Sequence, residues 1–371
     1  MKRWIGIGLA LLLGAAVVVA IVVGNRGGGT ETRELTVVRG VIGSEKKPFF
    51  DDQRVREVFA RHGLRVEVDT AGSRQIADSV DLKKYGFAFP SSAPAAEKIR
   101  RDQGATRTFA PFSSPMAIAT FEPIVGVLTK AGVVRDSGQG YQVFDVQKYL
   151  ELVAKGTRWD RLPGNTAYPA RKRVLLTTTD IRTSNSAAMY LAIAGYVANG
   201  DDVVTSDAQA SKVAETVAPL FLDQGYSETS TEAPFEDYLS LGIGKTPMIM
   251  VYEAQYASRL FSGDGSIRPD MRLLYPSPTV LSKHTLVPFS AQGTEVGRLL
   301  QEDPELGRLA AQYGFRTAHA KAFDDLVAKA KAPLPANLID VVEPPDHERL
   351  EAMITTIEQL YRSGAVPTPT P

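Results

Sequence analysis

The chain contains no cysteine among its 371 residues. This absence excludes disulfide bonds, a cysteine nucleophile, thiolate metal sites and acylation of a processed amino-terminal cysteine. The chain also carries no net charge, because 42 lysine and arginine residues balance 42 aspartate and glutamate residues. No overall field therefore attracts nucleic acid, and we expect no nucleic-acid partner.

Motifs for nucleotide binding and hydrolysis are incomplete or absent. Residues 241–246 resemble the end of a phosphate-binding loop, but Leu239 stands where the first glycine of that loop belongs. Pro247 and a strand-like stretch follow, in place of the helix whose amino end would bind phosphate. No Gly-x-Ser-x-Gly elbow occurs. We therefore expect neither a nucleotide loop nor a serine nucleophile of that kind.

Histidine is scarce, and its positions match no metal-ligand spacing. The four histidines are His62, His284, His319 and His347. We predict no metal site, no cofactor and no enzymatic activity. An enzyme that uses Asp180, Glu253 or His284 as an acid or a base is a weak alternative, because isolated carboxylates and histidines do not establish catalysis.

The longest apolar run covers residues 4–24 and follows Met1-Lys2-Arg3. At a helical rise of about 1.5 Å per residue it spans roughly 30 Å, the thickness of the hydrocarbon core of a bilayer. A cleaved signal peptide has a shorter apolar region of about 7–15 residues and a small-residue cleavage site, which this run lacks. We expect a retained transmembrane anchor and a Gly-rich linker over residues 1–34, with a cleaved signal peptide as the alternative.

Basic residues flank the apolar run on both sides. Lys2 and Arg3 precede it, whereas Arg26 and Arg33 follow it and are partly offset by glutamates. The positive-inside rule favours a cytoplasmic amino terminus by a small margin. We therefore expect a single-pass protein of the cell membrane whose globular part is extracytoplasmic.

About 335 residues follow the anchor, enough for two compact domains. Apolar periodicity predicts strands at residues 35–42, 64–68 and 87–89, and helices at residues 51–62, 72–85 and 93–101. This order is typical of parallel strands with right-handed crossovers. A second α/β series has strands at residues 173–179 and 248–252, and helices that begin at Asp145, Ser184, Asp303 and Asp346.

Two extended segments separate these series. Residues 108–120 carry two prolines, which fit poorly in the middle of a sheet, and residues 271–279 are also marked by proline. We interpret both segments as crossings between lobes. Lobe 1 then contains residues 35–116 plus 272–365, lobe 2 contains residues 117–271, and residues 366–371 form a disordered tail. The predicted fold is an α/β clamshell of two lobes that closes around a ligand by hinge motion.

Small hydroxyl residues recur just after predicted strands, where helices begin. Gly43-Ser44, Gly72-Ser73 and Ser91-Ser92 follow the first three strands, and residues 183–186 lead into a helix of the second series. Hydroxyls and free amides at converging helix amino ends form a natural site for an oxyanion. Each residue could instead be an ordinary N-cap. Four such places on the same side of the sheets favour a shared ligand cleft.

Charged residues beside these hydroxyls leave the sign of the ligand open. Glu45 and Glu253 would repel an anion in the cleft, whereas Arg74 and Arg182 would attract one. Arg74 is the sharper candidate, because a guanidinium pairs with a carboxylate or phosphate in a fixed fork. Tyr252 lies at a strand end and offers an aromatic wall and a hydroxyl donor.

These residues resemble the extracytoplasmic solute-binding proteins of ABC importers, in the type II class of the periplasmic-binding-protein fold that includes molybdate, sulfate and phosphate binders. The resemblance covers residues 35–330. Its motifs are Gly43-Ser44, Gly72-Ser73, residues 178–186 before Tyr190, residues 242–244 leading to residues 251–253, residues 274–279 and residues 313–316. The chain is also similar to the binding module of bacterial membrane proteins that carry a von Willebrand factor A domain. We do not expect a von Willebrand factor A domain in this chain.

The resemblance implies capture of a small solute, an oxyanion or a small carboxylated molecule, and its presentation to an ABC permease. In molybdate-type binders hydroxyls and amides hold the oxyanion, and the matching positions imply Ser44 and Ser73 from one lobe and Tyr252 from the other. The complete set of expected ligand-binding residues is Ser44, Ser73, Arg74, Ser184, Asn185, Ser186, Tyr252 and Glu253.

The chain departs from the family pattern at Glu45 and Arg74, and it lacks the lipid-anchoring cysteine common in such proteins. The alternative function is a membrane-tethered sensor or interaction protein that uses the same fold without transport. In either case we expect a monomer.

Overall fold

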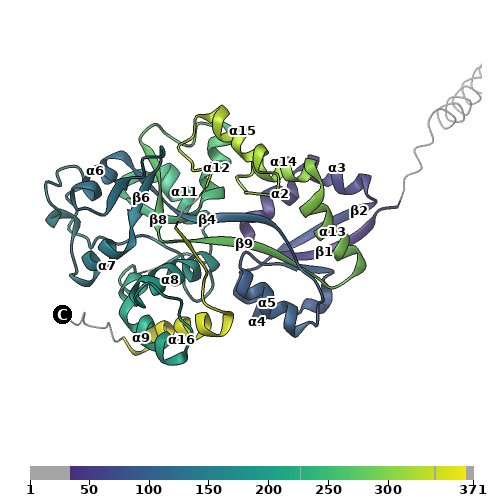
Figure 1. The fold of residues 1–371 in the computed structure, drawn as a ribbon, viewed down its shortest axis with the longest axis horizontal. Helices are drawn as coiled ribbons and strands as arrows, with labels where there is room; N and C mark the ends of the chain where they lie inside the picture. Colours follow the sequence, from purple (N-terminus) through teal and green to yellow (C-terminus); the bar gives the residue numbers. More distant parts are fainter. Residues whose placement is uncertain (1–33, 226, 338–339, 365–371) are drawn as a thin grey trace, which may run out of the picture.

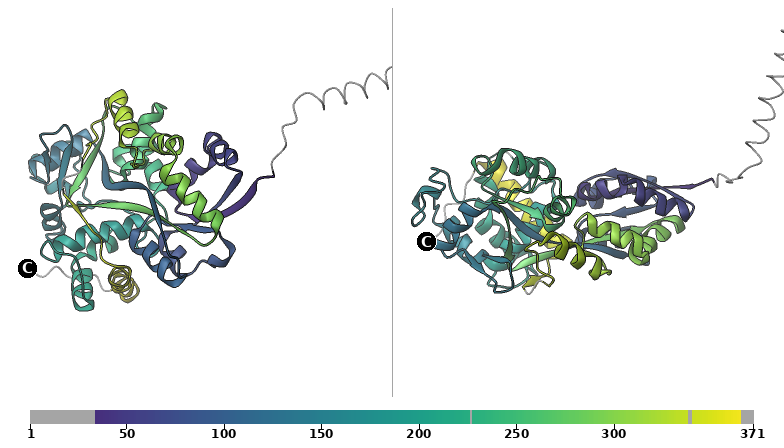
Figure 2. Two further views of the ribbon diagram at one scale, coloured as in Figure 1. Left: turned by 45° about the vertical axis from the view of Figure 1, so that its right-hand side comes forward. Right: turned by 90° about the horizontal axis from the view of Figure 1, so that it is seen from above.

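Two α/β lobes lie side by side in the computed structural model, and long strands run between them (Figures 1 and 2). The structure describes residues 34–225, 227–337 and 340–364. The predicted two-lobed α/β fold is confirmed, and the buried core lies between the strands and the helices that cover them.

Alternating apolar residues form the three strands that begin lobe 1. Strand β1 (Thr36–Ile42) lies between β2 (Leu64–Thr70) and β3 (Phe87–Phe89), and all three are parallel, as predicted. Their connections are η1 (Ser44–Lys46), α2 (Lys47–Asp51), α3 (Gln53–Arg61), α4 (Ser73–Asp78) and η2 (Leu82–Lys84), and α5 (Ala93–Asp102) follows β3. The helix expected over residues 72–85 is shorter, because α4 ends at Asp78 and Asp81 caps the separate turn η2.

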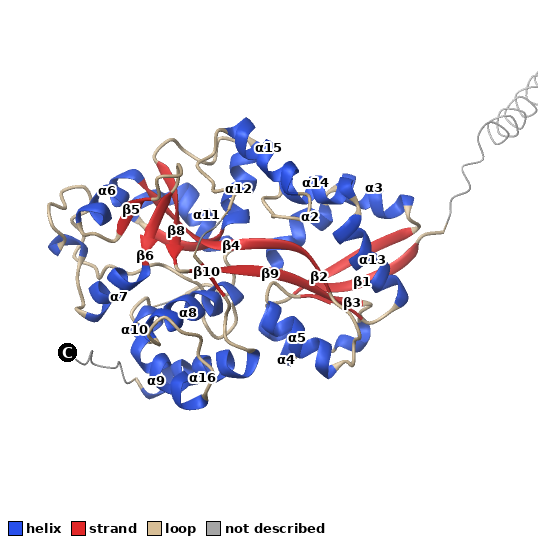
Figure 3. Cartoon of the chain, in the orientation of Figure 1, coloured by secondary structure: helices blue, strands red, loops and turns tan. Residues whose placement is uncertain are grey.

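The crossings between the lobes are strands of the sheet (Figure 3). Strand β4 (Phe109–Phe121) pairs first with β9 (Thr279–Pro288), and then with β7 (Met248–Tyr252) and β8 (Met271–Ser277). The expectation that prolines keep this segment out of a sheet is wrong. The register shifts between Phe109 and Phe112, around Pro111, and Pro115 pairs with Leu281. At such a bulge a strand can include proline, because the proline then stands where the ladder needs no backbone N–H donor.

Lobe 2 continues the sheet and adds its own helices. Strand β6 (Gln142–Asp145) is parallel to β8, and β5 (Val134–Asp136) is antiparallel to β6. The helices are α6 (Glu122–Lys130), α7 (Val146–Ala154), η3 (Trp159–Arg161), α8 (Asn185–Ala198), α9 (Asp207–Val217), α10 (Pro219–Leu222), α11 (Glu232–Leu241), η4 (Gly242–Gly244) and α12 (Glu253–Ser262).

The strand predicted at residues 173–179 is wrong. This segment makes only isolated bridges, from Arg173 and from Thr177. Two backbone amides of this segment donate to side chains instead of to a neighbouring strand. Tyr149 Oη accepts from the amide of Leu176, and Gln224 Oε1 accepts from the amide of Thr178. The segment therefore runs beside β7 without forming a continuous strand.

The carboxy-terminal part returns to both lobes. It contains α13 (Ala291–Glu302), α14 (Pro304–Gln312), α15 (Ala320–Ala330), β10 (Val341–Val342) and α16 (His347–Ser363). Asp303 and Asp346 cap α14 and α16, as predicted. Helix α16 packs mainly against α9 and also contacts α8, α10 and α5. It therefore touches both sides of the predicted lobe division, which stays a prediction.

The predicted anchor and linker at residues 1–34 lie outside the described residues, except for Glu34. The expected tail at residues 366–371 also lies outside them. Within the described part of the chain, no helix has both the length and the apolar character that a membrane span requires.

Candidate functional site

A cavity of about 270 Å³ lies between the lobes, where the loops after β1, β2 and β3 meet the amino ends of α8, α11 and α12. It is slightly smaller than the ~300–1,000 Å³ of common ligand pockets, which suits a solute of few atoms. Five of the predicted ligand-binding residues line it: Ser44, Ser73, Ser184, Asn185 and Tyr252. The structure thus brings residues from both predicted lobes to one place.

The helix amino ends around the cavity have no side-chain caps. The N-cap residues Gly43, Gly72, Ser184 and Thr231 of η1, α4, α8 and α11 make no side-chain cap hydrogen bond. By contrast, Asp145 accepts from a first-turn amide of α7. The interpretation of Ser184 as an ordinary cap is therefore wrong. The 14-residue helix α8 presents free amides and the positive end of its dipole at the cavity.

Two other serines of the hydroxyl pattern have structural roles. Ser92 caps α5, because its Oγ accepts from the amide of Ala95 at 3.4 Å. Ser73 Oγ accepts from the amide of Ser91 at 2.9 Å, which ties the loop after β3 to the start of α4. A hydroxyl both accepts and donates, so Ser73 keeps its own hydrogen for an acceptor in the cavity.

Asn185 connects the two lobes across the cavity. Its Nδ2 donates to the carbonyl oxygen of Ser91 at 3.1 Å and to Tyr252 Oη at 2.9 Å. Burial, together with the charge of Glu45, raises the pKa of the Tyr252 phenol far above its ordinary value. Tyr252 therefore stays neutral and keeps a proton that it can donate.

Three titratable side chains form a cluster at one wall of the cavity, and Ser91 joins them. Lys46 Nζ contacts Glu45 Oε1, lies 3.1 Å from His284 Nδ1 and donates to Ser91 Oγ at 2.7 Å. Ser91 Oγ in turn donates to Glu45 Oε1. Lys46 and His284 are fully buried, whereas the Glu45 side chain is 9% exposed and lines the cavity.

The cluster contains an ionised carboxylate. Burial opposes the ionisation of Glu45, but the Lys46 ammonium and the His284 ring outweigh it and hold the pKa of the carboxyl well below its usual range. Burial lowers the pKa of Lys46, and Glu45 partly offsets this effect. Burial and then the charge of Lys46 lower the pKa of His284 to about 4. The imidazole is therefore neutral at pH 7.

Arg74 and Ser186 do not line the cavity. The Arg74 guanidinium forms a two-pronged ion pair with Glu351 of α16 and donates to the carbonyl oxygen of Arg182. Its charge is therefore satisfied within the protein. Ser186 is buried in the first turn of α8, where its hydroxyl bonds to Thr179 Oγ1 at 2.7 Å.

Glu253 also lies away from the cavity. Its fully buried carboxylate binds Arg316 through Nε at 2.7 Å and Nη2 at 2.9 Å, and accepts from Tyr275 Oη at 2.6 Å. A buried carboxylate needs such partners, and here they come from residues far away in the sequence. Glu253 therefore joins α12 to Tyr275 of β8 and to Arg316 rather than facing a solute.

Several polar residues of the cavity wall were missing from the predicted set. They are Glu45, Thr70, Gln75, Ser91, Thr183 and residues 229–231. Ser91 and Thr183 belong to the hydroxyl pattern recognised in the sequence. Residues 229–231 are three consecutive hydroxyl residues directly before α11, so the same signal could have found them.

One group of residues in the described part of the chain has the donor types of a metal site. Single ligand atoms of Asp78, His347 and Glu351 lie within 4.8 Å of one another. However, Arg74 already pairs with Glu351, and Lys98 Nζ lies 3.6 Å from Asp78. Two cations therefore already pair with the carboxylates of this group, which lies between α4 and α16.

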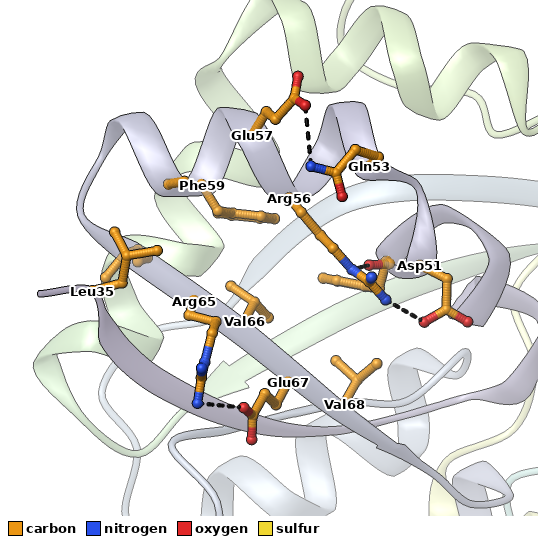
Figure 4. A pocket seen from close by; sticks show the side chains of 13 residues that line it. Leu35, Asp51, Gln53, Arg56, Glu57, Phe59, Arg65, Val66, Glu67 and Val68 are labelled. Carbon is orange, nitrogen blue, oxygen red and sulfur yellow. Dashed lines mark hydrogen bonds and ion pairs between the residues drawn. The ribbon is translucent and has the colours of Figure 1, made fainter. Parts of the chain in front are cut away.

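A larger hollow of about 530 Å³ lies at the outer edge of lobe 1, between α3 and the edge strand β2 (Figure 4). Phe59, Val66 and Val68 line its base, and the Arg56–Asp51 and Arg65–Glu67 ion pairs lie at its rim. It shares no residue with the interlobe cavity, and its charged side chains pair with each other. Convergent helix ends and interlobe contacts make the smaller cavity the better candidate site.

Known proteins resemble this chain in structure only. No protein-family model matches it, and no curated protein has a significantly similar sequence. An ABC-transporter solute-binding protein from Thermotoga lettingae, solved with α-D-tagatose, has 12% sequence identity and a TM-score of 0.51, and the match covers 90% of this chain and 96% of that one. This likeness shows the fold, which is the two-domain α/β fold of periplasmic binding proteins.

Two further solved structures have lower scores. A periplasmic binding protein from Actinobacillus pleuropneumoniae, with fructose-6-phosphate bound, has 10% identity and a TM-score of 0.49 over 88% of this chain and 97% of that one. The sulfate-binding protein of Mycobacterium tuberculosis has 15% identity and a TM-score of 0.48 over 81% of this chain and 93% of that one.

Proposed function

We propose that this protein binds a small polar solute in the interlobe cavity and presents it to an ABC permease in the membrane. The observation that carries the proposal is the free amino end of α8, which meets the loops after β1, β2 and β3 across a polar cavity of about 270 Å³. Uncapped amides offer a binding site that the protein itself leaves open. The fold shared with a solute-binding protein supports the same function.

The wall chemistry favours a solute that accepts hydrogen bonds from neutral donors. Ser44, Ser73 and Tyr252 supply hydroxyls, and no arginine or lysine lines the cavity among the described residues. An oxyanion or a small carboxylated molecule would bind to the amides of α8 without a countercharge. Binding requires only closure of the lobes, so it needs no covalent step.

Thermal unfolding of the purified protein tests this function directly. Molybdate, tungstate, sulfate, phosphate and amino acids are added separately, and a ligand that binds the folded state should stabilise it by an amount that grows with the logarithm of its concentration. At a hundred times the dissociation constant the gain is about 2.7 kcal/mol. No stabilisation by any of these solutes would contradict solute capture and favour the interaction role.

Serine-to-alanine variants test the position of the site. Ser44→Ala removes a cavity hydroxyl from an exposed residue, so affinity should fall while the unliganded protein keeps its stability. Ser73→Ala should lower affinity and also cost about 1–3 kcal/mol of unfolding free energy, because it leaves the buried Ser91 amide without its acceptor. Ser211→Ala, at an exposed position of α9, is the control. Unchanged affinity in both cavity variants would contradict this site.

A further inference from the structure

Glu45 is the one charged residue that lines the interlobe cavity among the described residues. Its known partners, Lys46, Ser91 and His284, all meet Oε1. Within the described part of the chain no hydrogen bond reaches Oε2. A carboxylate oxygen accepts more than one hydrogen bond, so Glu45 has unused acceptor capacity although its side chain is only 9% exposed.

The protein holds this carboxylate in place at a cost. A fully buried lysine supports it, and a buried ion pair is often no more stable than apolar residues of the same volume. Gly43 leaves room for this arrangement, because a Cβ there would clash with Ser91 Oγ and come within 2.7 Å of Glu45 Oε1. The carboxylate lies where the cavity meets an adjoining hollow of about 330 Å³, which Glu45 also lines.

The cavity wall therefore offers hydrogen-bond donors at one place and an acceptor at another. Helix α8 offers amide donors at its amino end, whereas Glu45 offers only an acceptor. An ion without a hydrogen, such as sulfate, satisfies the amides, but it leaves Glu45 Oε2 without a donor and places a second negative charge near this carboxylate. An acceptor atom without a donor and the repulsion between like charges are both unfavourable in a poorly solvated site, so such a ligand loses affinity at this wall.

We infer that the cavity selects a solute with two different ends, an anionic group for the amino end of α8 and a hydroxyl or ammonium group that donates to Glu45. This inference rests on the proposed function and names its substrate class as small hydroxy or amino acids. Glu45 is the residue that determines specificity, and Lys46 positions it.

Matched series of small acids test the inference on the full-length protein. The probes are propionate, lactate and alanine, then glutarate, 2-hydroxyglutarate and glutamate, with sulfate as the ion that has no donor. Titration calorimetry measures each affinity. We expect the hydroxy or amino member of at least one series to bind about ten- to a hundredfold more tightly than the member without a donor, as a hydrogen bond to an ionised group allows.

The Glu45→Gln variant should bring this preference close to one, and the acid without a donor should bind at least as tightly as before, because the charge that repels it is gone. If Glu45→Gln does not fold, the double variant Glu45→Gln/Lys46→Met removes both buried charges and serves in its place. Glu215→Gln, at an exposed position of α9, is the matched control and should keep the preference.

The possible results separate the two proposals. Equal affinities within both series, or tightest binding of sulfate, would overturn the role of Glu45 and leave solute capture intact. A preference that survives in Glu45→Gln would do the same. Absence of binding by every probe would overturn the proposed function together with the inference.

Discussion

His284 is buried beside two charged groups, and this makes the stability of the protein depend on pH. Its pKa is about 4 in the folded protein, below the ordinary value of 6.5. Between these values the unfolded chain binds more protons, so stability should fall as pH decreases from 6.5 toward 4. The expected loss is up to about 3 kcal/mol, because each pKa unit corresponds to about 1.4 kcal/mol. Urea unfolding at several pH values measures it.

The control for this prediction is His284→Asn, whose side-chain oxygen can still accept from Lys46. The variant should lose the part of the pH dependence between pH 6.5 and pH 4.5, which lies above the ordinary pKa of Glu45. The lowered pKa of Glu45 adds stability that is lost only at still lower pH. An identical slope in both proteins would show that His284 is not held neutral.

At the scale of single elements, α16 joins the two lobes through charge and packing. Its Glu351 pairs with Arg74 of α4, and the two side chains are 22% and 17% exposed. We predict a coupling free energy of about 1 kcal/mol from a double-mutant cycle with Arg74→Gln and Glu351→Gln, because the pair is two-pronged and partly buried. Urea unfolding of the four proteins provides the measurement.

The Lys321–Asp325 pair on α15 is the matched control for this cycle. Its side chains are 86% and 64% exposed, so Lys321→Gln and Asp325→Asn should couple by only about 0.3 kcal/mol. Equal coupling in the two cycles would mean that the Arg74–Glu351 pair adds no more stability than an exposed ion pair.

Elements whose signals are local could be predicted from the sequence. The alternation of β1 and β2 and the caps at Asp303 and Asp346 depend on neighbouring residues, and they appear where expected. The segment at residues 173–179 could not, because the side chains of Tyr149 and Gln224 replace its strand partners. Such contacts have no trace in the local pattern.

The same distinction explains the site. Ser44, Ser73 and Ser184 follow from the rule that small hydroxyl residues lie where strands lead into helices. The side chains of Arg74 and Glu253 point away from the cavity because they pair with Glu351 and Arg316, which are far away in the sequence. A charge next to a predicted cleft therefore cannot be assigned to it until its partner is known.

The whole molecule is described in an arrangement where the lobes touch, and Asn185 is central to that contact. A solute that binds between the lobes favours this arrangement only by its differential affinity for it. Asn185→Ala removes the hydrogen bonds to Ser91 and Tyr252, so the ratio of the closed form to the open form should fall roughly tenfold. The affinity for any stabilising solute should fall in parallel, since part of its binding energy then closes the lobes.

The absence of native cysteine makes this prediction measurable, because labels attach only at introduced thiols. Lys83→Cys in lobe 1 and Lys130→Cys in lobe 2 place dyes for energy transfer at exposed positions. Without solute, Asn185→Ala should show a longer mean dye distance than its parent, and a saturating solute should restore the parent distance. Asn199→Ala, at the opposite end of α8, should behave like the parent. If neither the variant nor the solute changes the distance, the lobes do not hinge about this contact.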